Sequence, residues 1–346
     1  MILTATPLRV SLFGGGTDYP AFFEHTPGAV LGMAIKKFCY VGVKPLPIGQ
    51  EAALEGKPLR YRVQYSHVDD CAEATQIKHP AVRAALKYLN IEDKLPLEFH
   101  CFSDLPGRAG LGGSSAFSVG LLLALRTMLN RPGTPHYTLT PGSAAALAAE
   151  ATHLEQKVIA ETVGCQDQVL TAHGGINMVT FQKDKFPQVS PLVVPASRAQ
   201  ALEEALFLVY SGTMRDAHVM AAKQIAAIPN HHAILCKMGS MAQVGAKILA
   251  DPDRPLDMLG KMLDVAWHLK CLLCPEISND NINALYKRGR AMGALGGKLL
   301  GAGGGGFFLF YVPEGRRTKF VEGINAPWCQ FQVSPHGSHV VINNGH

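Results

Sequence analysis

Ten consecutive residues, 106–115, have the glycine and hydroxyl content of a phosphate-binding loop. Their sequence is PGRAGLGGSS, with four glycines ahead of two serines. The alternation of apolar and polar residues at 95–102 predicts a strand before them, and the apolar segment 116–125 predicts a buried helix after them. The first N–H groups of a helix bind anions, and glycine lets a phosphate come close. We therefore expect phosphate to bind along Pro106, Gly107, Arg108, Ala109, Gly110, Leu111, Gly112, Gly113, Ser114 and Ser115.

The spacing of these glycines excludes two common nucleotide-binding loops. Gly113 stands where a P-loop needs the lysine that contacts the outer phosphates. The dinucleotide pattern G-x-G-x-x-G also fails, because its last position is Ser115. A glycine-rich turn without a ligand is the alternative, although four glycines carry an entropic cost that an ordinary turn does not need.

Two further segments could contact a phosphate or a polyol. Residues 296–306 (GGKLLGAGGGG) form either a packing crossover or a loop pressed against a ligand or against the first glycine loop. Arg9 is the only charged residue of an apolar segment, so an inward orientation would require an anionic partner, whereas a surface edge would not. Asp18 follows GGGT in a loop that could hold a polyol.

Two carboxylates have the surroundings of reacting groups. Asp167 lies between two glutamines, just before an apolar segment. It suits a general base, and the alternative is a helix N-cap. Glu155 lies on an alanine-rich helix, either on a solvated face or in a magnesium shell with Ser114.

The composition narrows the class of protein. The chain has 346 residues, 47% of them hydrophobic, which predicts two domains with a large core. The net charge is +5, and the basic residues do not form a continuous block, so we expect no nucleic-acid partner. No long apolar run and no signal pattern occur, so we expect a cytoplasmic protein without a membrane partner. The eight cysteines include one C-x-x-C, at 271–274, and indicate reduced thiols.

The segments RVSLFGGGTDYP, PGRAGLGGSSAFSVG, VGCQDQ and GGKLLGAGGGGFFLFY together resemble the signature segments of the GHMP small-molecule kinases. The resemblance runs from about Arg9 to Val312. Irregular mixing of predicted strands and helices indicates an α+β fold, and the resemblance implies two domains with the active site in the cleft between them. We assign residues 1–190 to an N-terminal domain with the phosphate-binding loop and 191–346 to a C-terminal domain.

The resemblance also implies a role for each candidate residue. ATP would bind at the first glycine loop, and Mg²⁺ would bind Ser114 and Glu155. Asp167 would be the base, with Arg9 as its charge partner. Gly303 to Gly306 would close over the first loop, and Asp18 would bind sugar hydroxyls. The expected substrate contacts are Gly14, Gly15, Gly16, Thr17, Asp18, Arg215, Gly303 and Gly304.

Within the family, the chain looks most similar to the D-glycero-α-D-manno-heptose 7-phosphate kinases. That similarity implies phosphorylation of the anomeric hydroxyl to the 1,7-bisphosphate, for nucleotide-activated heptose and surface polysaccharide. The alternatives are a GHMP kinase for a galactose- or fucose-type sugar and a sugar- or nucleotide-binding regulator without turnover. The 7-phosphate could bind at 14–16, Lys36, Lys37 or Arg215, and the sequence leaves a homodimer open.

Overall fold

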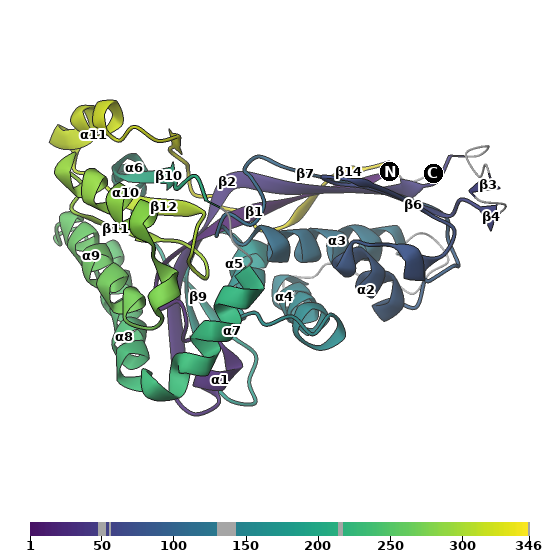
Figure 1. The fold of residues 1–346 in the computed structure, drawn as a ribbon, viewed down its shortest axis with the longest axis horizontal. Helices are drawn as coiled ribbons and strands as arrows, with labels where there is room; N and C mark the ends of the chain where they lie inside the picture. Colours follow the sequence, from purple (N-terminus) through teal and green to yellow (C-terminus); the bar gives the residue numbers. More distant parts are fainter. Residues whose placement is uncertain (48–52, 55–56, 130–142, 214–216, 345–346) are drawn as a thin grey trace.

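The structure is a computed structural model that describes residues 1–47, 53–54, 57–129, 143–213 and 217–344 (Figure 1). A large sheet runs along one end of the molecule. Its strands within the described residues are β1 (Ile2–Phe13), β2 (Gly28–Pro45), β5 (Tyr61–Gln64), β6 (Val68–Cys71), β7 (Leu97–Ser103), β8 (Ile176–Phe181), β9 (Gln188–Pro191) and β14 (His339–Asn343). Their order is β14-β1-β2-β7-β5-β6, and β8 joins β2 to β9.

β1 and β2 form the longest pairing of this sheet. β2 has 18 residues, which lets it pair with β8 through Gly28–Met33 and with β7 through Cys39–Pro45. β1 is buried along nearly its whole length, and it pairs with β2 from Ile2 to Phe13 and with β14 from Ile2 to Ala5. The register between β1 and β2 shifts after Pro7 and again after Ser11. The second shift lies just before the loop that contains Asp18.

Helices cover one face of the large sheet (Figure 1). They are α2 (Pro80–Tyr88), α3 (Gly113–Leu129), α4 (Ser143–His153) and α5 (Gln166–His173). α3 is buried on almost every side because its sequence is apolar all round, and it packs on β1, β2 and the neighbouring helices. A π-helical turn at Leu154–Val158 continues α4 and contains Glu155. The loop before α3 and the first turn of α5 lie at the same end of the helical layer, because Arg9 bonds to both Gly110 and Asp167.

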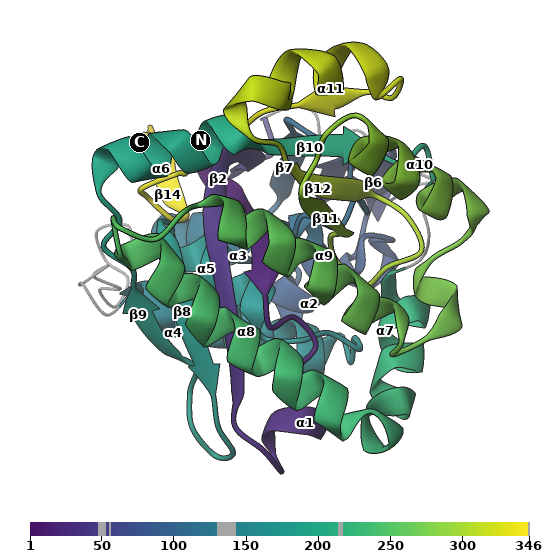
Figure 2. The ribbon, with the colours of Figure 1, turned by 90° about the vertical axis from the view of Figure 1, so that its left-hand side faces the viewer.

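The other half of the molecule is a smaller sheet with its own helices (Figure 2). The sheet has the order β11-β12-β10-β13. Its strands are β10 (Leu206–Tyr210), β11 (Gly296–Leu299), β12 (Phe307–Tyr311) and β13 (Trp328–Cys329). The helices are α6 (Ala196–Ala205), α7 (Ala217–Ala227), α8 (His232–Ala250), α9 (Asp257–Cys271), α10 (Asp280–Ala291) and α11 (Arg317–Gly323). Trp267, Tyr286, Phe308 and Phe310 form part of the core between sheet and helices.

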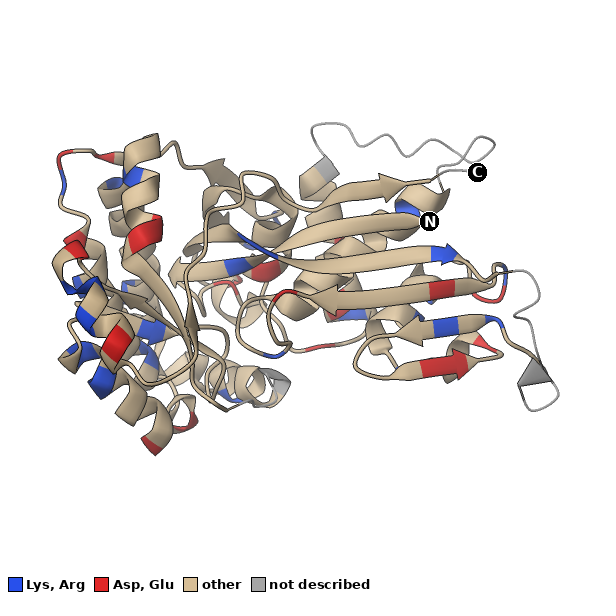
Figure 3. Cartoon of the chain, turned by 90° about the horizontal axis from the view of Figure 1, so that it is seen from above, with Lys and Arg blue, Asp and Glu red and all other residues tan. Residues whose placement is uncertain are grey.

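Short elements complete the described chain: α1 (Pro20–Phe23), β3 (Ala53–Leu54), β4 (Lys57–Pro58) and several 3₁₀ turns. Basic and acidic residues are intermixed on the helices of the smaller half (Figure 3). No described helix combines the length and the apolarity needed to span a membrane.

The predicted α+β class is confirmed, as are the strand before the first glycine loop and the helix after it. The division at residue 190 stays a prediction, with one correction. β14 pairs with β1, so His339–Asn343 belong to the large sheet, although we assigned them to the second domain. The chain returns because β1 would otherwise leave an edge of unpaired backbone groups. Arg215, one of the expected substrate contacts, lies outside the described residues.

Candidate active site

The two glycine-rich segments contact each other through their backbones. The N–H of Phe307 donates to the carbonyl of Ala109 at 2.9 Å. A Cβ on Gly110 would lie 2.5 Å from the carbonyl oxygen of Leu300, and one on Gly301 would lie 2.6 Å from the Cα of Gly110. Both glycines have positive φ, +80° and +69°. The sequence left open whether the second glycine loop (residues 300–306) is a packing crossover or presses against a ligand or against the first glycine loop (residues 106–112). The structure shows it pressed against the first glycine loop.

Arg9 joins the first glycine loop to Asp167. Its Nε and Nη2 donate to the two carboxylate oxygens of Asp167 at 2.7 and 2.6 Å. Its Nη1 donates to the carbonyl of Gly110 at 2.6 Å. The Arg9 side chain is 4% exposed and that of Asp167 is 25% exposed. The bidentate pair is thus buried on the arginine side and open on the carboxylate side, which is compatible with the predicted role of Asp167 as a base.

Asp18 holds the start of α5, which carries Asp167 in its first turn. Its carboxylate accepts from the N–H of Gly16 at 2.9 Å and of Gln166 at 3.3 Å. The residue is 1% exposed. Burial, and secondarily the charge of Asp167, raises the pKa of Asp18. Contact with sugar hydroxyls stays a prediction, and the structure shows instead that Asp18 caps α5 from a distant part of the chain.

Glu155 lies in a cluster of hydrogen-bonding side chains beneath the start of α3. It is 1% exposed, and its Oε2 accepts from the Ser115 hydroxyl at 3.0 Å and from the Gln168 amide. Its Oε1 and the Gln168 Oε1 are buried and accept no hydrogen bond from any described residue. Burial raises the pKa of Glu155 to about 7, against the lowering influence of nearby Ser118, Gln168 and Ser115.

The hydroxyl that reaches Glu155 belongs to Ser115, whereas we expected Ser114. Ser114 is exposed at the first turn of α3, and Ser115 is buried. A magnesium role for Ser114 stays a prediction, because Mg²⁺ commonly reaches part of its shell through water. The described residues contain no cluster of three or more His, Cys, Asp or Glu side chains arranged for a metal.

The other expected substrate contacts lie around this centre. Gly15 is near Gln166, and Gly16 packs against Leu235 of α8. Thr17 is buried, and its hydroxyl donates to the carbonyl of Gly14 at 2.8 Å, so it fixes the loop from behind. Gly303 and Gly304 pack against Ile277. Lys36, a candidate for binding the 7-phosphate, donates to the Gln332 side chain at 3.1 Å.

Two buried lysines, Lys270 and Lys298, were not among the predicted site residues. Lys298 is the single charged residue of GGKLLGAGGGG, so the sequence alone could have singled it out. Lys270 lies in the last turn of an amphipathic helix, where a lysine is ordinary, so no sequence pattern distinguishes it. Lys270 donates to the carbonyls of Leu299 and Gly301 at the base of the second glycine loop.

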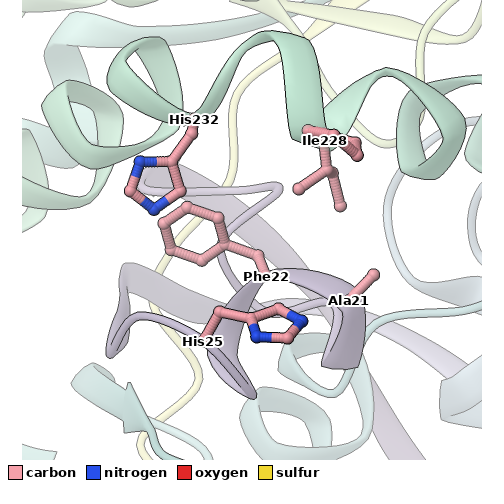
Figure 4. Close-up of a pocket in the computed structure, with 6 residues that line it drawn as sticks. Ala21, Phe22, His25, Ile228 and His232 are labelled. Carbon is pink, nitrogen blue, oxygen red and sulfur yellow. The ribbon is translucent and has the colours of Figure 1, made fainter.

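A cavity of about 320 Å³ lies beside the loop that follows Asp18 (Figure 4). His25 and Phe22 line it from the α1 side, Ile228 from the 3₁₀ turn before α8, and His232 from the first residue of α8. The Thr26 hydroxyl and His232 Nε2 are 2.8 Å apart. The lining residues include no Lys or Arg, so the cavity offers a phosphate no permanent positive charge.

The comparisons with known proteins cover both halves. Models of the GHMP kinases N terminal domain and of the GHMP kinases C terminal domain match residues 77–175 and 249–328. D-glycero-alpha-D-manno-heptose 7-phosphate kinase from Campylobacter jejuni is 28% identical over 333 residues, covering 93% of each chain. The bifunctional fucokinase/GDP-fucose pyrophosphorylase of Arabidopsis thaliana is 26% identical over 97% of this chain and 32% of its own.

The solved structures agree on the fold. The structure of a D-glycero-D-manno-heptose 1-phosphate kinase from Bacteriodes thetaiotaomicron superposes with a TM-score of 0.76, at 19% identity over the whole of both chains. The N-terminal family match contains the first glycine loop, Glu155 and Asp167, and the C-terminal match contains the second glycine loop. The N-terminal and C-terminal domain models of one family thus match this chain in order, and both matches include the glycine loops of the site. This chain belongs to the GHMP kinase family.

Proposed function

We propose that this protein is an ATP-dependent kinase that phosphorylates the anomeric hydroxyl of D-glycero-α-D-manno-heptose 7-phosphate to give the 1,7-bisphosphate. The observation that carries the proposal is the Arg9–Asp167 pair, bonded directly to Gly110 of the first glycine loop. Through this pair, the carboxylate that we propose as the base and the loop that we propose for phosphate binding belong to one hydrogen-bonded unit. Phosphoryl transfer depends mainly on such positioning and on electrostatic stabilisation.

Asp167 would remove the proton of the accepting hydroxyl. The hydroxyl oxygen forms a bond to the γ-phosphorus of ATP, the bond to the β–γ bridging oxygen breaks, and ADP leaves. An anomeric hydroxyl is more acidic than an ordinary alcohol, so a carboxylate is an adequate base. Arg9 holds both oxygens of Asp167 in place, and the open side of the carboxylate leaves room for the substrate.

The residues around Glu155 fit a magnesium ion. The buried Oε1 of Glu155 and Oε1 of Gln168 are oxygen acceptors without a donor among the described residues. Mg²⁺ prefers oxygen ligands and is commonly held by one or two carboxylates together with waters and phosphates. Glu155, with Ser114 or Ser115, would hold it. The ion would neutralise charge on the phosphates.

The substrate class is supported by the relative from Campylobacter jejuni, whose match extends over nearly all of both chains. The match to the fucokinase enzyme, which also spans this chain, favours a second candidate, a kinase for a free sugar. A substrate panel separates the two. ADP release is measured with heptose 7-phosphate, free heptose, fucose and galactose, and the phosphorylated position is identified by ³¹P NMR.

The role of Asp167 is tested by Asp167→Asn, which keeps the shape of the side chain. We expect turnover to fall by on the order of a hundredfold or more, which is a usual size for the loss of a general base. The exposed Asp253→Asn is the matched control. Turnover within tenfold of wild type in a folded Asp167→Asn protein would contradict the assignment. Absence of ADP release from the wild-type protein with every sugar would instead favour a regulator without turnover.

A further inference from the structure

Two lysines lie buried beneath the glycine loops without a carboxylate partner. Lys270 of α9 is 6% exposed and Lys298 of β11 is 4% exposed. Neither takes part in any ion pair between the residues that the structure describes. Buried ammonium groups are rare without a paired anion because removing their charge from water is costly. Their presence here therefore calls for a compensating function.

Lys270 holds the second glycine loop from behind. Its Nζ donates to the carbonyl of Leu299 at 2.9 Å and to that of Gly301 at 2.5 Å. A trans peptide directs its N–H opposite to its carbonyl, so the N–H of Ala302 points away from Lys270. The same loop contacts Gly110, whose carbonyl accepts from Arg9. Lys270 is thus linked through backbone to the Arg9–Asp167 pair.

Lys298 holds the end of β1 in a similar way. Its Nζ donates to the carbonyls of Ser11 and Leu12 at 3.0 and 3.2 Å. The register of β1 against β2 shifts between Ser11 and Phe13, and a shift of this kind interrupts the backbone pairing. The glycines of 14–16 follow directly. Lys298, from the smaller sheet, therefore fixes the strand that leads into the expected sugar-binding loop of the other half.

The two lysines and Arg9 form a concentration of positive charge. Burial lowers the pKa of Lys270 to about 8, with Arg9 lowering it further and Cys271 raising it. Burial also lowers the pKa of Lys298, as do Lys270 and Arg9, while Asp18 raises it. Arg9 thus acts on both lysines, and Lys270 acts on Lys298. A polyanion at the glycine loops would relieve this repulsion.

We propose that Lys270 and Lys298 form a buried cationic support for the phosphates of the nucleotide, replacing from behind the loops the charge that Gly113 cannot supply. The support has two parts. Lys270 orients the backbone of the second glycine loop through its carbonyls, and Lys298 orients the end of β1 in the same way. The charge of both lysines attracts the phosphates through a region of low dielectric constant. The inference rests on the proposed nucleotide-dependent function.

The test is a series of ligands with increasing charge. Dissociation constants for adenosine, AMP, ADP and ATP are measured by calorimetry in EDTA at low ionic strength, for the wild type and for Lys270→Met and Lys298→Met. Methionine keeps an unbranched side chain that is only one atom shorter and removes its charge. Lys261→Met, an exposed position on α9, is the matched control.

We expect the ratio of the adenosine to the ATP dissociation constant to fall about tenfold in each buried-lysine variant and to stay unchanged in Lys261→Met. Both dissociation constants of the ratio are measured on the same protein sample. Partial unfolding of a variant therefore affects them equally and does not change the ratio. If both variants keep the wild-type ratio, or weaken all four ligands equally, the lysines act only as packing groups and the inference fails. If the wild type binds none of the four ligands, the proposed function fails together with it.

Discussion

Arg9 and Asp167 are 158 positions apart in the chain, and their pairing defines the centre of the site. The arginine uses three nitrogens: two bind the carboxylate and the third binds the loop carbonyl of Gly110. A lysine could not make this planar, forked set of contacts. The position of Asp167 is therefore coupled to the position of the first glycine loop by one side chain.

Glu155 provides a residue-scale prediction about pH. Its folded-state pKa, about 7, is above the ordinary value of 4.5, so folding favours the protonated form. The stability that this proton contributes is complete below about pH 4.5 and is lost as the pH rises through 7. In EDTA, the unfolding free energy of wild type relative to Glu155→Gln should fall by on the order of a few kcal/mol between about pH 5 and pH 8. Urea unfolding of both proteins measures it.

A stability difference between wild type and Glu155→Gln that does not change with pH would show that the buried carboxylate is already ionised at pH 5. Added Mg²⁺ gives an independent check. At about pH 8 it should stabilise the wild type and leave the Gln variant unaffected, because a bound cation compensates the buried negative charge.

At the scale of elements, the two glycine loops act as one unit. The first is fixed by Arg9 and the second by Lys270, and they touch where Gly110 meets Gly301. Neither position accepts a Cβ without moving backbone, and both have φ values that L-residues rarely adopt. The loops therefore cannot separate without changing the surroundings of Asp167.

Gly110→Ala tests this unit. We expect the ATP dissociation constant to rise by about tenfold and the unfolding free energy to fall by roughly 1–3 kcal/mol, because the backbone strain and the contact with Leu300 act together. Calorimetry and thermal unfolding measure the two effects. Gly107→Ala in the same loop is the control, since its Cβ would meet nothing within 4 Å. Equal behaviour of the two variants would mean that the contact between the loops does not support nucleotide binding.

The sequence predicted the elements of the site better than the contacts among them. The strand at 95–102, the loop and the helix after it follow from local periodicity and glycine content, and β7 and α3 confirm them. Arg9 could be singled out because a charge in an apolar strand needs a partner. The capping of α5 by Asp18 and the bond from Ser115 to Glu155 depend on residues distant in the chain, which no local pattern encodes.

At the scale of the whole molecule, the last described strand returns to the sheet where the chain began. β14 pairs with β1, and the segment before it lies against α5. The Ser338 N–H donates to the carbonyl of Thr171 at 3.0 Å, and the Ser338 and Thr6 hydroxyls are 2.7 Å apart. The C-terminal segment thus contacts both the strand that carries Arg9 and the helix that carries Asp167. No local sequence pattern indicates that β14 pairs with β1, because pairing at such separation is set by the assembled sheet.

A chain that ends at Pro335 tests whether this return supports the site. Removing β14 turns β1 into an edge strand and deletes its backbone pairing together with the Ser338 bonds. We expect a loss of a few kcal/mol in unfolding free energy, since each net hydrogen bond contributes about 1 kcal/mol. Hydrogen exchange should show faster opening of α5 and β1 than of the distant β10–β12 pairing. A chain that ends at Asn344, which keeps β14, is the control. Unchanged protection of α5 in the shorter chain would show that Arg9 and Asp18 hold this helix without help from the C-terminal segment.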